Sequence, residues 1–219
     1  MTDEPKPGRQ WKSTTNTRER VLSSARAVFA ELGYAEASIG AIVERSGVSV
    51  GSIYHHFGGK AALFDELWHE YTKVMSGAAR SAAARERNAG CTDPAELFIA
   101  AAKGYLESLT DPDVAELGLL FRPGSGPPGF DAASRRSQEA WIRSNAVMLG
   151  LTTTVEGRLR AAVVTGIIAE GEMCYLDSRD PRSLAVLSAE VVRLLQRVLA
   201  EPPERAGSRD TCETRSITP

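Results

Sequence analysis

The residues between positions 38 and 60 combine short hydroxyl side chains with a tyrosine, two histidines and a lysine. Groups of this kind form hydrogen bonds. The mixture suits phosphate oxygens and the edges of nucleic-acid bases as partners. Ser38 and Ser49 each precede a helix-forming run, where a serine side chain caps free backbone amides. Ser38 and Lys60 also mark expected helix starts, where free amides favour a phosphate group. The chemistry expected here is therefore the binding of a phosphate-bearing partner.

A short helix expected from Ser49 to Phe57 divides its side chains between two faces. At about 100° per residue, one face is apolar and is expected to be core; it holds Val50, Ile53 and Phe57. The opposite face is small and polar; it holds Gly51, Ser52 and His55. Tyr54 and His56 flank the apolar face. A glycine at position 51 lets the backbone approach a partner closely.

This division of faces predicts a surface that contacts DNA. The residues that we expect to make the contact are Ser38, Ser49, Gly51, Ser52, Tyr54, His55 and Lys60. Two alternatives concern single positions. Tyr54 could serve mainly in packing, because it lies beside the apolar face. His55 and His56 could form a metal pair, but adjacent helical residues point apart, so we expect no metal site.

Three short helices would position these groups. The first begins near Thr17 and ends at Gly33, the second follows Ser38 and closes at Gly47, and the third runs to Phe57. Short helices joined by glycine-containing turns are typical of a helix-turn-helix unit, whose last helix enters the major groove of DNA.

The stretch from Thr17 to Trp68 resembles the N-terminal domain of tetracycline-repressor (TetR) type regulators. The resemblance rests on segments 27–34, 38–42, 46–49 and 51–57, and on Lys60 with Ala62 and Leu63. It implies an all-helical homodimer that binds an operator palindrome, usually as a repressor released by a small molecule. Gly40 departs from the family pattern and would loosen the second helix, and Gly58-Gly59 replaces a more rigid turn after the third helix.

The rest of the chain is also helical by pattern, which predicts an all-α fold. Helices are expected over 60–87, 94–109, 113–121, 134–149, 155–176 and 181–200, with a loop over 122–129. We expect four parts: a flexible tail over 1–16, the helix-turn-helix domain over 17–60, a helical effector-binding and dimerisation domain over 61–200, and a second flexible tail over 201–219.

Two helices near the end are expected to be buried on more than one side. The run 161–169 is uncharged, Gly166 allows close helix approach, and apolar residues recur at spacings of three and four from Leu184 to Val198. The predicted dimer interface consists of Val163, Gly166, Ile167, Leu184, Leu187, Val191, Leu194 and Val198. The alternative is an ordinary core helix pair in a monomer.

A ligand cavity is predicted where aromatic and methionine side chains mix with a few polar groups. Its candidate residues are Phe98, Tyr105, Leu109, Phe121, Trp141, Asn145, Met148 and Met173. The alternative for each is a place in the core. Composition favours an apolar or aromatic effector, and the helix that begins at Lys60 would link this cavity to the DNA-binding unit.

Composition and the absence of certain motifs narrow the classes of protein to which this chain could belong. Residues 1–60 carry eight Lys or Arg against six Asp or Glu, so the chain's net negative charge lies beyond them. The polar, acidic start is not a secretory signal, no apolar run approaches about 18 residues, and three distant cysteines indicate a reducing cytoplasm. Catalytic motifs for hydrolases, phosphate-binding loops and zinc proteases are absent, so we expect no enzyme and no cofactor. The rival classes are a small helical enzyme and a protein-interaction adaptor that does not bind DNA.

Overall fold

The computed structural model describes residues 7–152, 154–178 and 180–200, with side chains from Asn16 onward, and these ranges contain helices and no strands. The all-α prediction is therefore confirmed. The elements are α1 (Pro7–Glu36), α2 (Ile39–Ser46), α3 (Val50–Phe57), α4 (Lys60–Asn88), α5 (Pro94–Glu107), the 3₁₀ turn η1 (Ser108–Thr110), α6 (Pro112–Leu120), α7 (Phe130–Met148), α8 (Val155–Ser178) and α9 (Ser183–Ala200).

Local capping explains why α2 and α3 form where they do. The Ser38 hydroxyl accepts a hydrogen bond from the Ala41 amide at 3.1 Å, and the Ser49 hydroxyl accepts one from the Ser52 amide at 3.3 Å. Each helix ends at a left-handed glycine, a conformation that residues with a side chain rarely adopt. These predicted starts and stops are confirmed.

The first helix differs from its prediction. It begins at Pro7 rather than near Thr17, so positions 7–16, which the sequence assigned to a flexible tail, continue the helix. Proline is favoured at the first position of a helix, although it also marks loops. Gly33, the predicted stop, interrupts α1 with φ 73° and ψ 166°, and the helix continues to Glu36. The predicted tail residues 1–6 and 201–219 lie outside the described residues.

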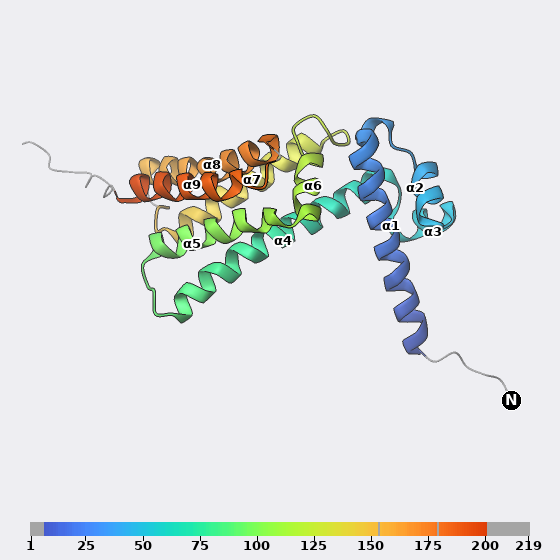
Figure 1. Ribbon diagram of the computed structural model, residues 1–219, viewed down its shortest axis with the longest axis horizontal. Coiled ribbons are helices and arrows are strands. Elements are labelled where there is room, and N and C mark those ends of the chain that lie inside the picture. Colours follow the sequence, from blue (N-terminus) through green and yellow to red (C-terminus); the bar gives the residue numbers. More distant parts are fainter. Residues whose placement is uncertain (1–6, 153, 179, 201–219) are drawn as a thin grey trace, which may run out of the picture.

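Helix α4 connects the two ends of the molecule. Helices α1 to α3 lie together at one end, and α4 leads from them along α5 towards the bundle that α5 forms with α7, α8 and α9 (Figure 1). Phe64, fully buried on α4, packs edge-on against Phe29 of α1 and against Phe121 and Phe130. One aromatic cluster therefore holds α1, α4 and the α6–α7 connection together.

Candidate nucleic-acid interface and ligand cavity

Helix α3 and the caps of α2 and α3 present polar groups to solvent. Ser38, Ser49, Gly51 and His55 are exposed, and the Tyr54 side chain is 53% exposed. Ser52, which was predicted with them, is partly exposed. The structure thus brings six of the predicted DNA-contact residues to accessible positions on two consecutive short helices.

Val50 corrects the predicted division of faces. It was assigned to the core with Ile53 and Phe57, yet Val50 is 48% exposed, whereas Ile53 is fully buried. Phe57 is half-buried beneath the Arg18 guanidinium, which lies 4.8 Å from its ring centre. Val50 is the first residue of α3. Helical periodicity places it on the core side, but the core does not extend over this end of the helix.

The Lys60 ammonium group is engaged inside the fold. Its Nζ donates hydrogen bonds to the backbone oxygens of Tyr34 at 2.8 Å, Ala35 at 3.2 Å and Ala37 at 2.9 Å. It also lies 4.4 Å from the centre of the Tyr34 ring. Lys60 therefore holds the connection between α1 and α2, and the structure does not group its charge with the exposed hydroxyls.

Three arginines of α1 and α2 are also bound to other groups of the fold. The Arg20 guanidinium donates to the Ser46 oxygen at 2.5 Å, and Arg18 forms an ion pair with Glu66. Arg45 pairs with Glu31 at 2.6 Å, and this hydrogen bond lowers the pKa of Glu31. Hydroxyl, imidazole and helix-terminal amide groups therefore dominate what α3 offers to a partner.

Gly51 has no evident role in the fold. A Cβ atom built there would meet nothing within 4 Å. A glycine inside a helix costs about 1 kcal/mol relative to alanine. The helix therefore carries a destabilising residue at a position where the protein itself would tolerate a side chain.

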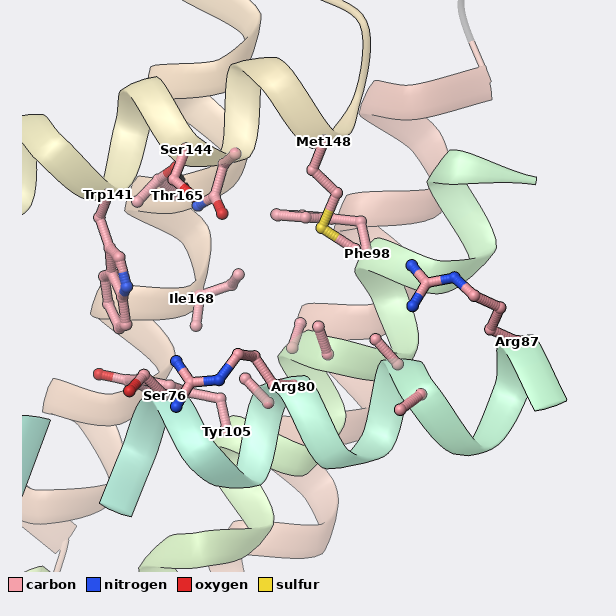
Figure 2. Close-up of a pocket in the computed structure, with 16 residues that line it drawn as sticks. Ser76, Arg80, Arg87, Phe98, Tyr105, Trp141, Ser144, Met148, Thr165 and Ile168 are labelled. Atoms are coloured by element: carbon pink, nitrogen blue, oxygen red, sulfur yellow. Dashed lines mark hydrogen bonds between the residues drawn. The ribbon is translucent and has the colours of Figure 1, made fainter. Parts of the chain in front are cut away.

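A cavity of two neighbouring chambers, which share the lining residues Ser76, Tyr105, Trp141 and Thr165, lies among α4, α5, α7 and α8. The first chamber has a volume of about 500 Å³ and is shown in Figure 2; its predicted lining residues are Phe98, Tyr105, Trp141, Asn145 and Met148. The second chamber has a volume of about 650 Å³; its predicted lining residues are Tyr105, Phe121, Trp141 and Met173. Tyr105 and Trp141 border both chambers, with ring centres 4.9 Å apart. Leu109, the remaining predicted residue, is instead fully buried in the core, away from both chambers.

Sequence reasoning missed the charged groups of the cavity. Arg80 and Arg87, seven positions apart on one side of α4, border the first chamber (Figure 2), and Glu172 borders the second. The spacing on α4 was a usable signal, but charged residues on a long helix usually face solvent. Asn145 donates to the Thr165 hydroxyl at 2.9 Å and so joins α7 to α8.

Two tyrosines bind the carboxyl group of Glu172. Tyr71 of α4 donates to one oxygen, and Tyr105 of α5 donates to the other at 2.5 Å. Burial raises the pKa of Glu172, and the two hydrogen bonds act in the opposite direction. Burial and the neighbouring carboxylate raise the pKa of both tyrosines, which keeps their hydroxyls protonated as donors.

The predicted dimer interface divides into buried and exposed residues. Leu184 and Val191 are 6% and 4% exposed and belong to the protomer's own core, because α9 turns them towards the bundle. The remaining predicted residues, Val163, Gly166, Ile167, Leu187, Leu194 and Val198, are exposed or partly exposed. Leu159 and Val155, which the prediction omitted, are 65% and 67% exposed along α8.

Two further features are absent from the described part of the chain. It contains no cluster of three or more His, Cys, Asp or Glu residues that could hold a metal ion. No helix within it is both long and apolar enough to cross a membrane.

Comparisons with known proteins agree with this architecture. Residues 21–67 match the family described as bacterial regulatory proteins, tetR family. Over 194 residues the chain is 30% identical to the HTH-type transcriptional regulator LmrA of Bacillus subtilis, a match that covers 83% of this chain and 98% of LmrA.

Two further similarities cover different shares of the chain. It is 46% identical over 62 residues to the HTH-type transcriptional repressor AcnR of Corynebacterium glutamicum, which is 28% of this chain and 33% of AcnR. A solved TetR-family transcriptional regulator from Pectobacterium atrosepticum has a TM-score of 0.58 at 24% identity and covers 88% of this chain and 98% of its own. The first similarity covers less than a third of the chain, and the second concerns the fold.

Proposed function

Since this chain belongs to the TetR family of DNA-binding transcriptional regulators, we propose that it is a homodimeric repressor that leaves its operator when a small molecule enters the helical domain. The exposed polar face of α3 is the observation that carries the proposal. The residues that we propose contact DNA are Ser38, Ser49, Gly51, Ser52, Tyr54 and His55, with Val50 added as an apolar contact. A protein with this role acts in the cytoplasm, where the operator is.

Lys60 has a supporting role in this proposal. Its three hydrogen bonds to the α1–α2 connection keep the Ser38 cap in place relative to α4. The free amides at the N-terminus of α3, next to Ser49, are then available to a backbone phosphate. Val50, at the same end, could contact a thymine methyl group.

Dimerisation is proposed through the outer face of α8 and α9. Val155, Leu159 and Val163 form an exposed apolar line at helical spacing on α8, and Val198 of α9 borders the same hollow as Leu159 and Val163. Pairing two such faces would bury this line in a four-helix contact. Two α3 helices about 34 Å apart would then enter successive major grooves of an operator palindrome.

The cavity is the proposed effector site. Helix α4 begins beside the DNA-binding unit at Lys60 and borders both chambers farther along, at Ser76. A ligand that favours a different α4 position would move the two α3 helices relative to each other. By linkage, it must then weaken DNA binding by the same factor by which DNA weakens ligand binding.

The test is binding of the purified protein to the DNA upstream of its own coding sequence. The expected result is a shift of that DNA in preference to random DNA of equal length. A Tyr54→Ala, His55→Ala double variant should lose the shift while remaining a dimer by light scattering. A control variant with Arg135→Ala and Arg136→Ala, two exposed charges on α7, should retain it. A wild-type protein that does not discriminate between the two DNAs would contradict the proposal.

A further inference from the structure

The second chamber places an acidic group among aromatic rings. Glu172 borders this chamber, whose aromatic lining residues are Trp68, Tyr71, Tyr105, Phe121 and Trp141. Trp68 and Phe121 lie edge to face, with ring centres 5.0 Å apart. The lining around a buried carboxyl group therefore consists largely of π systems.

Glu172 has no cationic partner among the described side chains. The ion pairs of that part of the chain do not include it, and its two oxygens accept hydrogen bonds from Tyr71 and Tyr105. A buried carboxylate without a positive partner is costly, and two neutral hydroxyl donors offset only part of that cost. The basic side chains that border the chamber, Lys73 and His69, are both exposed.

Aromatic faces and a carboxylate attract the same kind of ligand. The face of a tryptophan, tyrosine or phenylalanine ring attracts a cation, most strongly where water is excluded. An anionic ligand would instead be repelled by Glu172. The first chamber differs in this respect, since Arg80 and Arg87 border it.

We propose that the second chamber binds a lipophilic organic cation, with its positive centre beside Glu172 and its apolar groups against the aromatic wall. The proposal rests on the proposed function and adds the chemical class of the effector. A cation beside Glu172 would also compete with the hydroxyl of Tyr71 for the carboxylate. Because Tyr71 belongs to α4, a ligand in the chamber would change the contacts of the helix that leads to the DNA-binding unit.

The test uses two probes of nearly equal shape and opposite charge, tetraphenylphosphonium and tetraphenylborate. Binding to the full chain is followed by calorimetry and by tryptophan fluorescence, since two of the three tryptophans, Trp68 and Trp141, border the chamber. Tetraphenylphosphonium should bind saturably, and Glu172→Gln should weaken it at least tenfold. The same variant should leave tetraphenylborate binding unchanged or stronger, because glutamine keeps the size of the side chain and removes its charge.

Two further measurements separate folding and function from ligand class. Glu170→Gln, which removes an exposed carboxylate of the same helix outside the chamber, should retain binding of the phosphonium, and thermal unfolding reports whether each variant folds. The inference is overturned if the phosphonium does not bind, or if Glu172→Gln weakens both probes equally or neither. The wild-type shift on upstream DNA, measured without probe, tests the proposed function separately: a protein that selects its DNA but rejects the phosphonium refutes only the inference.

Discussion

The hydroxyl of Tyr71 donates a hydrogen bond to the carboxyl group of Glu172 and joins α4 to α8 across 101 sequence positions. Tyr105 brings α5 to the same carboxyl group. Three helices around the cavity therefore meet at one acidic side chain, and one of them begins at the DNA-binding unit. This arrangement makes the interior of the helical domain sensitive to the charge of a single residue.

Replacing Tyr71 with phenylalanine should lower the free energy of unfolding by about 1–2 kcal/mol, because a buried hydrogen bond is lost while the ring remains. Urea unfolding at fixed protomer concentration measures the change. In a double-mutant cycle with Glu172→Gln, the two effects should fall short of additivity, since each variant weakens the same hydrogen bond. Additive effects would show that Tyr71 and Glu172 do not act on each other.

Stability should depend on pH through Glu172. Its folded pKa lies above its ordinary value because burial disfavours the charged form. Below the ordinary pKa of a glutamate, Glu172 is protonated in both the folded and the unfolded state, and its contribution to the free energy of unfolding is complete. That contribution is lost as pH rises from the ordinary pKa through the folded pKa. The loss is about 1.4 kcal/mol for each pH unit between the two pKa values.

The matched variant for this effect is Glu172→Gln, which does not titrate. We expect the free energy of unfolding of the variant to rise relative to that of the wild type between about pH 4 and pH 8. Tyr71 and Tyr105, with raised pKa values, stay protonated over this range and do not contribute. A constant difference between the two proteins would mean that Glu172 titrates normally.

Lys60→Met should destabilise the protein by about 1–3 kcal/mol, because backbone oxygens at the end of α1 and in the α1–α2 connection lose a charged donor. If Lys60 contacted a DNA phosphate, its loss would also reduce the slope of log DNA affinity against log salt concentration by about one. We expect that slope to stay unchanged, since the ammonium group binds inside the fold. Lys103→Met, at an exposed site on α5, controls for the change in net charge.

A feature could be predicted from the sequence when the residues that cause it lie close together in the chain. Ser38 and Ser49 cap helices through amides three residues away, so their roles follow from neighbouring sequence. Val50 and Leu184 show the limit of periodicity. It gives the angle of a side chain around its helix, but not whether another element covers it at that point or which subunit does so.

The cavity shows the same limit over longer distances. Its aromatic residues could be proposed from composition, since such residues line many ligand sites. Glu172 could not, because its partners Tyr71 and Tyr105 lie far away in sequence and become neighbours only when α4, α5 and α8 pack together. A single acidic residue on a helix gives no sign of this by itself.

Gly51→Ala should separate stability from DNA binding. Alanine at this open helical position should raise the free energy of unfolding by about 0.5–1 kcal/mol, yet weaken operator binding if the backbone of α3 approaches DNA closely. Gly77→Ala on α4, where an added Cβ also meets nothing within 4 Å, should give a similar gain and leave DNA affinity unchanged. Equal DNA affinity in both variants would remove Gly51 from the contact surface.

Val163 and Val74 allow a matched test of dimerisation, because their side chains are 42% and 41% exposed on α8 and α4. Val163→Asp would place a charge in the proposed four-helix contact, where desolvation without a partner costs several kcal/mol. Val74→Asp would place the same charge at a similarly exposed site away from that face. Sedimentation should show the first variant as a monomer and the second as a dimer. Operator affinity should then fall steeply for Val163→Asp alone, since a single α3 helix contacts only half of the palindrome. If both variants remain dimers, the subunits meet elsewhere, and the exposed apolar line on α8 requires another explanation.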